Sequence, residues 1–510
     1  MNSKLKVIYL WCWEQSKDDY TKAAALIVSI VLIAMHITWW KLIKRNSRKE
    51  KASLPPGPWG LPLIGYLPFL DPELHRCFAQ LSLKYGPIVK VYLGSKLCII
   101  FSSPDVAKEV LKEQDVNFAD RDIPAAAFVS AYGAVDIAFA PYGEHWRMMR
   151  KVCVRELLSY GRLEALYGLR RREVRDMVQS VYTKIGSPID IGEYAFLAMF
   201  NVITSMMWGN TLDGEERRRV TSKFREGKER RMKEVVKYFD QIFDFVINER
   251  RKMETQEEDE ALKSKDKENK DFLQVLLQLI DQGDQKTPIA ITHLKALFVN
   301  MTVGGTKTTS TTVEWAMTEL LKQPDIMQKA REELDQVVGL NNVVEENHLS
   351  KLPYLDAVVK EVLRLHPVGP LLIPRRARES CNVGGYLIPK GAVIFVNTWT
   401  IQRDSKYWTD PLEFRPERFL YSNVTWDYNG NDVRYLPFGS GRRICVGIPI
   451  AEKVAPYLLA SLLHSFDWKL PEGTKLDLSD QFGFELKKKI PLFAVPTPRL
   501  VDSTLYNQTR

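Results

Sequence analysis

The chain has 510 residues and a mass of 58.7 kDa, which is enough to bury a large core. Hydrophobic residues make up 45% and charged residues 26%, a balance that excludes wholesale disorder. The six cysteines are scattered, with no C-x-x-C pair and no Cys/His cluster. This spacing argues against zinc ribbons, ferredoxin-type clusters and disulfide frameworks, and it fits reducing conditions for most of the chain.

The positive charge is concentrated at the N-terminus. The whole chain carries a net charge of +9, and residues 1–51, with ten basic and four acidic residues, carry +6 of it. A nucleic-acid-binding protein usually carries its excess charge on the folded body. Here the excess flanks an apolar segment, so we expect no nucleic-acid partner.

That apolar segment, residues 23–40, has no formal charge and ends in Trp39 and Trp40. Its length is near the lower limit for a membrane-spanning helix, and tryptophans are common at the membrane interface. More basic residues follow it than precede it, so the positive-inside rule predicts a lumenal segment 1–22, a single-pass anchor at 23–40 and a cytosolic body. A cleaved signal peptide is the alternative, but no small-residue cleavage site follows the apolar run.

Residues 41–69 are expected to form a basic, proline-rich hinge. Four prolines between Leu54 and Pro62 exclude a helix and favour a stiff, extended connector. Such a connector would fix how a globular domain sits against the membrane.

The remainder, 70–510, is predicted to be one large domain that is mainly α-helical with small β-sheets. Nothing in it has the composition of a linker between two cores. Amphipathic periodicity predicts helices over 105–113, 144–158, 162–184, 312–338 and 349–366. Strand-like runs are shorter and lie towards the two ends of this region, at Ile88–Tyr92, Leu97–Ser102 and Val393–Asn397. The almost wholly charged segment Glu249–Asp271 is expected to be a solvated loop or helix end.

The chemistry is predicted to centre on Cys445. Glycines nearby in the chain allow tight turns and a close approach to a flat group. A predicted helix, Ile448–Leu463, starts just after the cysteine, and the amides at its N-terminus favour a thiolate. Arg443 is placed to meet a carboxylate. This combination suits an axial thiolate ligand to haem iron, which promotes O–O cleavage.

The stretch from Phe438 to Gly447 resembles the haem-binding signature F-x-x-G-x-R-x-C-x-G of the cytochrome P450 monooxygenases at every specified position. The resemblance extends over nearly the whole chain and is closest to plant endoplasmic-reticulum members. It implies that Cys445 ligates the iron of haem b. It also implies that Phe438, Gly441, Arg443 and Gly447 shape the haem site.

Further motifs follow the order of this family. Trp146 and Arg150 match a W-x-x-x-R motif whose members would bind a haem propionate, with Arg375 as a third donor. Glu361 and Arg364 share a helix face and match the E-x-x-R pair, which Arg418 would join in a structural role.

The segment Leu297–Trp315 is expected to be the long helix on the distal side of the haem. The adjacent Gly304 and Gly305 each cost a helix interior about 1 kcal/mol, so a local gain should offset them. The resemblance implies a widened groove there and gives Thr308 a part in proton delivery; a simple kink with solvent-facing threonines is the alternative. The family normally has an acid where this chain has Lys307, from which we infer slower or poorly coupled oxygen activation, or an altered outcome.

A second departure concerns the substrate entrance. The segment Phe224–Met232 is shorter than in related plant enzymes, which implies either an abbreviated lid or an artefact of the gene sequence. The resemblance places three apolar segments at the substrate pocket, namely Phe118–Gly133, Pro367–Ile373 and Phe482–Phe484.

The sequence therefore predicts a haem-thiolate monooxygenase of the endoplasmic-reticulum membrane that oxidises a lipophilic plant metabolite such as a terpenoid, alkaloid or flavonoid. It would use O2, with electrons from NADPH supplied by NADPH–cytochrome P450 reductase, because the chain has no dinucleotide fingerprint. Two alternatives remain open. One is a haem-thiolate isomerase or dehydratase that needs no reductase, and the other is a catalytically impaired haem protein.

Overall fold

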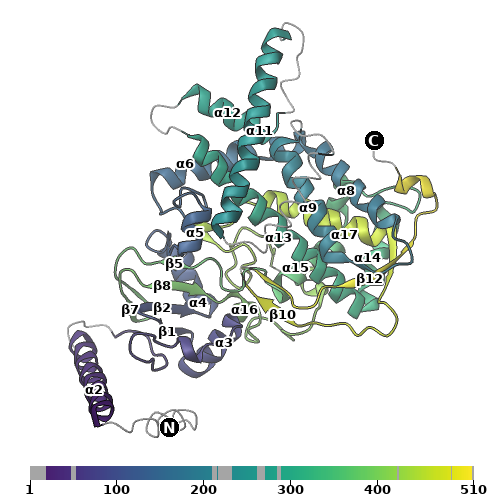
Figure 1. Ribbon diagram of the computed structural model, residues 1–510. Helices are drawn as coiled ribbons and strands as arrows, with labels where there is room; N and C mark the ends of the chain where they lie inside the picture. Colours follow the sequence, from purple (N-terminus) through teal and green to yellow (C-terminus); the bar gives the residue numbers. More distant parts are fainter. Residues whose placement is uncertain are drawn as a thin grey trace.

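A computed structural model describes residues 19–47, 53–209, 215, 232–260, 270–283, 289–421, 424–483 and 485–507. Within these residues the chain is mainly helical, with the five-stranded sheet on one side of the molecule and β12 on the other (Figure 1). The helices are α2 (Asp19–Ser47), α3 (Leu74–Tyr85), α4 (Pro104–Lys108), α5 (Ala125–Ser130), α6 (Glu144–Val152), α7 (Tyr160–Ala165), α8 (Tyr167–Tyr182), α9 (Ile191–Trp208), α11 (Met232–Glu260), α12 (Phe272–Gln282), α13 (Ile291–Lys322), α14 (Pro324–Val337), α15 (Pro353–Leu365), α16 (Thr398–Ile401) and α17 (Ile448–Ser465).

The largest sheet has five strands in the order β1-β2-β8-β5-β3. Its strands are β1 (Ile88–Leu93), β2 (Lys96–Phe101), β8 (Val393–Val396), β5 (Arg375–Arg376) and β3 (Asp120–Arg121). The hairpin of β1 and β2 turns at Gly94, whose φ of 62° suits a two-residue turn. Strand β8 pairs parallel to β2, which joins chain segments nearly 300 residues apart.

Three smaller sheets complete the β-structure of the described residues. One has the order β4-β12-β9, another pairs β10 with β11, and the last pairs β6 with β7. Their strands are β4 (Ile189–Asp190), β6 (Cys381–Val383), β7 (Tyr386–Ile388), β9 (Phe466–Lys469), β10 (Asp480–Phe482), β11 (Leu486–Lys488) and β12 (Phe493–Pro498).

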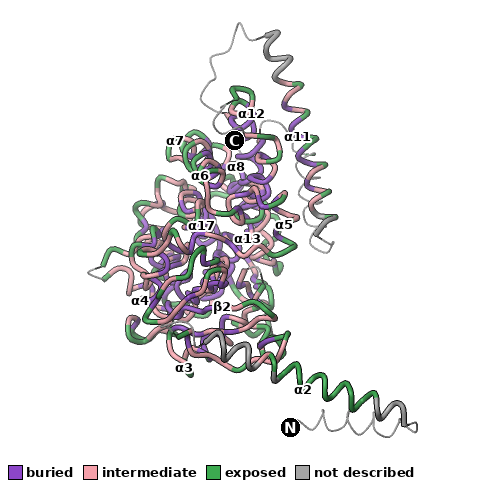
Figure 2. Tube along the Cα trace, turned by 90° about the vertical axis from the view of Figure 1, so that its left-hand side faces the viewer, coloured by how far each residue is buried: buried purple, intermediate pink, exposed green. Residues whose placement is uncertain are grey.

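The main core lies among the long helices. Helix α9 packs along α13, and α13 also contacts α15 and α17. Buried apolar side chains from these helices form one large cluster, while two smaller clusters lie around the five-stranded sheet. Figure 2 shows α13 and α17 in the buried interior and α11 on the outside. Helix α13 is therefore held on several sides, which makes it a rigid support for side chains of a site.

Several predicted helices are divided where the backbone cannot continue them. The predicted helix 312–338 is two helices, because Pro324 lacks the amide that would bond back to the preceding turn and instead starts α14. The predicted helix 162–184 is also two, α7 and α8, which meet at Leu166. The predicted helix 349–366 begins only at Pro353, after a short 3-10 turn. The three predicted strands are confirmed as β1, β2 and β8.

The apolar N-terminal segment lies within helix α2, which stands away from the rest of the molecule (Figures 1 and 2). Its apolar side chains are exposed, for example Leu26 at 64%, Ile30 at 57% and Ile33 at 59%. No helix in the described parts of the chain meets both the length and the apolarity needed to cross a bilayer. The proline-rich residues 54–60 form no helix, as predicted, and a turn between Leu61 and Gly65 follows them.

Candidate functional site

The loop from Phe438 to Gly447 can form only with glycine at position 441. Gly441 has a φ of 71°, and a Cβ there would lie 2.0 Å from the carbonyl oxygen of Leu111. Any other residue would combine backbone strain with a collision against main-chain atoms. The loop closes where the amide of Cys445 donates to the carbonyl of Phe438 at 3.1 Å. Helix α17 then begins at Ile448, as predicted.

Opposing effects act on the pKa of the Cys445 thiol. Its side chain is accessible, yet the surrounding protein desolvates the thiol strongly enough to raise its pKa. The amide of Gly447 donates to the sulfur at 3.3 Å, and this bond, the positive charge of Arg150 and the amide of Ile448 each act to lower the pKa. The sequence predicted that such amides would favour a thiolate. The amides do act in this direction, but in the protein alone burial outweighs them and the pKa is raised. A coordinating metal ion would deprotonate the thiol.

Arginine side chains gather beside this loop. Arg443 donates to the carbonyls of Ala119 and Ala140, at 2.6 Å each, and its guanidinium lies 4.4 Å from the ring centre of Trp146. Arg150 donates to the carbonyl of Ile444 at 2.8 Å. The structure thus brings Trp146, Arg150 and Arg443 to the cysteine loop, as the resemblance implied. In the structure these three side chains donate hydrogen bonds to backbone carbonyls.

Arg375 has a donor left over. Its Nη2 donates to the carbonyl of Ser440 at 2.9 Å, whereas its buried Nη1 has no hydrogen-bond partner among the described residues. Burial and the nearby charge of Arg443 lower the pKa of Arg375 to about 10. Buried cations that lower each other's pKa are stabilised by a bound anion. The site therefore has both a sulfur donor and a place for negatively charged groups, which is what haem, with its iron and propionates, requires.

Arg121 is a further member of this arginine group that the sequence analysis missed. It lies on β3 directly opposite Arg375 on β5, and it donates to the carbonyls of Ala138 at 2.9 Å and Ile373 at 2.5 Å. Burial, Arg375 and Arg443 all lower its pKa. The sequence could have indicated Arg121, because it is an arginine within an apolar segment. That segment, Phe118–Gly133, was assigned to the substrate pocket without naming single residues.

Thr308 lies on the side of α13 that borders accessible space. Its hydroxyl donates to the carbonyl of Gly304 at 2.7 Å, one turn earlier. Gly304 and Val303 are exposed although α13 runs through the core, and a Cβ on Gly304 would meet no atom within 4 Å. Gly305 packs instead against α9, where a Cβ would lie 3.0 Å from Ile203. The helix continues unbroken through both glycines.

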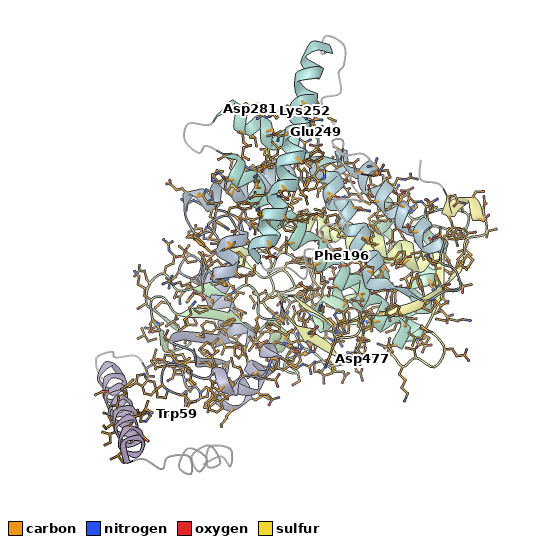
Figure 3. All side chains as sticks on the ribbon, in the orientation of Figure 1. Trp59, Phe196, Glu249, Lys252, Asp281 and Asp477 are labelled. Atoms are coloured by element: carbon orange, nitrogen blue, oxygen red, sulfur yellow. The ribbon has the colours of Figure 1, made fainter. Side chains whose placement is uncertain are left out.

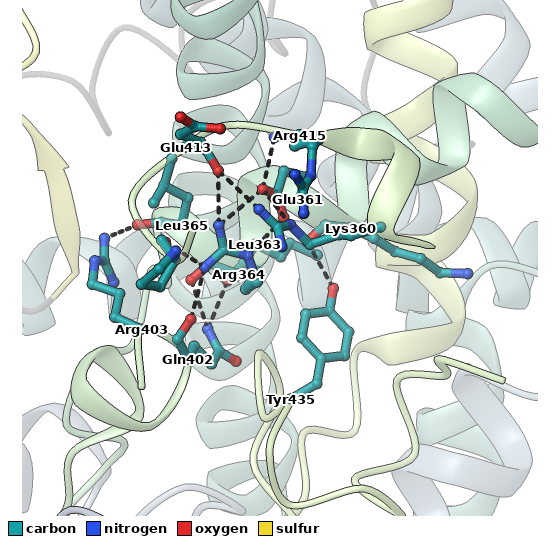
Figure 4. Close-up of polar contacts among 12 residues, drawn as sticks. Lys360, Glu361, Leu363, Arg364, Leu365, Gln402, Arg403, Glu413, Arg415 and Tyr435 are labelled. Carbon is teal, nitrogen blue, oxygen red and sulfur yellow. Dashed lines mark hydrogen bonds and ion pairs between the residues drawn. The ribbon is translucent and has the colours of Figure 1, made fainter. Parts of the chain in front are cut away.

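The predicted Glu361–Arg364 pair is fully buried and is joined by Arg418 (Figure 4). Arg364 also donates to the carbonyls of Gln402 and Pro411, at 2.8 Å each. Gln402 in turn accepts from the amide of Leu436, two residues before Phe438. The network therefore connects α15 with the segment that leads into the cysteine loop.

The segments expected at the substrate pocket differ in their surroundings. Leu372 reaches the cysteine loop, with side-chain atoms 3.6 Å and 3.8 Å from the position of a Cβ on Gly439. Phe118 is instead fully buried in the core beside the sheet, because it packs among strand residues. The ring of Phe482 lies 5.6 Å from that of His75 on α3. Phe484, and the predicted abbreviation at Phe224–Met232 apart from its last residue, lie outside the described residues.

A second group of polar side chains lies apart from the cysteine loop. Glu73, His75 and Asp480 offer ligand atoms within 4.8 Å of one another. Arg76 already forms a two-bond pair with Asp480, at 2.7 and 2.8 Å, and Arg403 adds a second positive charge. These cations oppose the binding of a metal ion, so we interpret the group as a structural contact between α3 and β10.

Comparisons with known proteins agree with this site. The sequence profile of the Cytochrome P450 family matches residues 55–227 and 217–494. Salviol synthase from Salvia pomifera is 38% identical over 92% of this chain and 97% of its own length. Geraniol 8-hydroxylase from Swertia mussotii is 38% identical over 91% and 97%, and flavonoid 3',5'-hydroxylase from Solanum melongena is 36% identical over 92% and 96%.

A solved structure of a zebra fish cytochrome P450 with abiraterone superimposes with a TM-score of 0.73. It is 28% identical and covers 84% of this chain and all of that one. The chain therefore belongs to the cytochrome P450 family, and within it to the plant monooxygenases of specialised metabolism. The family implies haem-thiolate iron and O2 as the means of oxidation.

Proposed function

We propose that Cys445 is the axial ligand of haem b in an NADPH- and O2-dependent monooxygenase. The observation that carries this proposal is the sulfur of Cys445, accessible within the fold and held by the Gly447 amide next to a group of buried arginines. When bound there, haem would supply the activation of O2 for insertion of one oxygen atom into the substrate. Electrons would come from NADPH through NADPH–cytochrome P450 reductase.

The residues around the loop would hold the propionate side of the haem. Arg375 is best placed, because its Nη1 has no hydrogen-bond partner among the described residues. Arg150, Arg443 and Trp146 would add positive charge and shape while keeping their bonds to backbone carbonyls. Phe438, Gly441 and Gly447 would set the path of the loop. On α13, the Thr308 hydroxyl would hold and pass a proton at Oγ1.

The substrate would be a lipophilic plant metabolite of the terpenoid, alkaloid or flavonoid type. Support comes from the names of the relatives, which include a geraniol hydroxylase and a flavonoid hydroxylase. The family profile matches in two stretches that overlap at 217–227, which is where the sequence analysis found a shortened lid. An abbreviated lid would leave the pocket more open to bulky substrates.

The N-terminal segment would attach the enzyme to the endoplasmic-reticulum membrane. The exposed apolar side chains of α2 and the basic residues after it support this assignment. The chain would then divide into a lumenal segment 1–22, an anchor 23–40, a hinge 41–69 and a cytosolic catalytic domain 70–510.

The first test is the carbon-monoxide difference spectrum of the reduced protein in microsomes. The thiolate-type Soret band is expected for the native protein and for Cys153→Ala, and it should be absent in Cys445→Ala. Cys153 is the matched control because it is a fully buried cysteine near the same site, where the charges of Arg150 and Cys445 act on its pKa. A native protein without this band would refute the proposed ligand. A native protein with the band should then oxidise members of a terpenoid and flavonoid panel only when NADPH and the reductase are present.

A further inference from the structure

Lys307, the residue where this sequence departs from the family pattern, has an acidic partner in the structure. Its Nζ lies 4.0 Å from Oε1 of Glu485, which sits between β10 and β11. The same ammonium lies 5.7 Å from the ring centre of Phe196 on α9, a residue marked in Figure 3. The Lys307 side chain is 33% exposed and that of Glu485 is 12% exposed. One lysine on α13 therefore contacts both a neighbouring helix and the β10–β11 hairpin.

This pair continues a series of opposite charges between α13 and the elements packed on it. One step along, Glu314 of α13 attracts Lys488 of β11, and Glu314 also accepts from the amide of Leu492 at 3.0 Å. Further along, Glu319 lies 2.8 Å from His366, but burial lowers the pKa of His366, so this contact is a hydrogen bond and not part of the charge series. At roughly 100° per residue, positions 307 and 314 share one face of the helix, whereas Glu319 lies about 120° around the helix from Lys307. Lys307 thus adds an ion pair near a second attraction between opposite charges on α13 and β11.

The ring of Trp315 adds to the same contact. It stacks on His366 with the ring centres 3.9 Å apart, and the ammonium of Lys488 lies 4.8 Å from the centre of that ring. The inner part of the contact is therefore packed and buried, whereas the outer end, at Lys307 and Glu485, carries an ion pair whose lysine is partly exposed. Breaking that pair would loosen the end of the hairpin without exposing the buried part.

The hairpin end is connected to the rest of the site. The amide of Leu486, next to Glu485, donates to the carbonyl of Val368 at 2.8 Å. The segment that begins at Val368 reaches the cysteine loop through Leu372, which packs against Gly439. A shift of Glu485 would therefore be transmitted to the segment that packs against the cysteine loop.

We propose that Lys307 is a positioning residue that acts through Glu485: the pair fixes the β10–β11 hairpin to α13 and so sets the shape of the substrate pocket. The consequence for binding rests on the proposed function. Because the ammonium is directed towards Glu485, it is held by the hairpin and does not serve as the proton donor for Thr308. The lysine at this position then determines specificity rather than oxygen activation.

A charge-swap experiment tests the proposal. Lys307→Glu and Glu485→Lys each place like charges together, whereas the double variant K307E/E485K restores an attractive pair. Hydrogen exchange of peptides covering residues 480–488 should be about fivefold faster in each single variant and within about twofold of the native rate in the double variant. Lys390→Glu is the matched control, since it reverses a charge in the exposed pair with Glu379. It should leave exchange in this hairpin unchanged.

Ligand binding supplies the second measurement. Spectral titration with 1-dodecylimidazole should show about fivefold weaker binding in each single variant, with recovery in the double variant. Imidazole, which is too small to touch the hairpin, should bind all four proteins within about twofold of one another. If the single variants exchange at the native rate, or if the double variant remains as fast as the single ones, the pair has no positioning role. If the native protein lacks the reduced carbon-monoxide band, the proposed function is refuted. The hydrogen-exchange measurements on the single and double variants still show whether Lys307 and Glu485 fix the hairpin.

Discussion

Arg364 donates from Nε and Nη2 to both carboxylate oxygens of Glu361, at 2.7 and 2.8 Å, and neither side chain is exposed to solvent. Glu361 also accepts from the amide of Arg415 and from Nε of Arg418. Figure 4 shows how this pair joins α15 to the segments that precede the cysteine loop. Glu and Arg three residues apart usually form an exposed pair on a helix surface. Here the pair is buried, because other segments of the chain pack over it.

We expect Glu361→Gln to destabilise the protein by about 3–5 kcal/mol, because it leaves the Arg364 charge buried without its counter-ion. The temperature at which half of the reduced carbon-monoxide band is lost measures this effect. Glu379→Gln removes one member of an exposed ion pair and should cost less than about 0.5 kcal/mol. Equal losses in the two variants would contradict a special role for the buried pair.

Gly441→Ala should prevent the cysteine loop from closing. The substitution puts a Cβ 2.0 Å from the Leu111 carbonyl oxygen, at a residue whose φ is 71°. The matched control is Gly473→Ala, because Gly473 has a φ of 73° but no atom within 4 Å of the added Cβ. The control should lose only about 1–2 kcal/mol through backbone strain, while Gly441→Ala should lose haem. Haem content per protein, measured by absorbance, separates the two, and equal retention would contradict the steric argument.

Stability should fall as the pH drops below about 6.5, the ordinary pKa of histidine. Burial lowers the pKa of His75 and of His464 to about 4, so the unfolded chain binds protons that the folded protein does not. Each histidine then removes stability between pH 6.5 and pH 4, by about 2 kcal/mol at pH 5. Thermal unfolding at pH 7.5 and pH 5 measures the loss.

His464→Gln is the informative variant for this pH dependence. His464 Nε2 contacts the Gly339 carbonyl oxygen at 3.1 Å, a partner that a glutamine amide can also reach by donation. The variant should lose less stability between pH 7.5 and pH 5 than the native protein, because one titrating group is gone. An unchanged dependence on pH would show that His464 protonates as easily in the folded state as in the unfolded one.

Thr308→Ala should uncouple NADPH consumption from product formation, with about tenfold less product per NADPH, because the proton held at Oγ1 is lost. Thr308→Ser keeps a hydroxyl that can donate to Gly304 and should stay within about threefold of the native protein. Thr312→Ala is the control, since the Thr312 hydroxyl donates to the carbonyl of Thr308, one turn away. If it uncouples the enzyme as strongly as Thr308→Ala, the effect belongs to the helix and not to the Thr308 hydroxyl.

The sequence alone determined the family and the type of fold, because these depend on residues that are close together in the chain. The signature from Phe438 to Gly447, the Glu361–Arg364 spacing and the strand pattern at Ile88–Tyr92 are all local. Helix ends were harder to predict, as at Pro324 and Leu166, since apolar periodicity continues across a break in the backbone.

Only the tertiary structure decided which charges meet. Arg121 joins Arg375 because β3 pairs with β5 across more than 250 residues, and Lys307 meets Glu485 because the β10–β11 hairpin folds onto α13. The same holds for the pKa of Cys445: the sequence predicted that nearby amides favour the thiolate, but burial raises the pKa despite them. Its value depends on how much protein surrounds the sulfur, and desolvation is a property of the packed fold that no local pattern records.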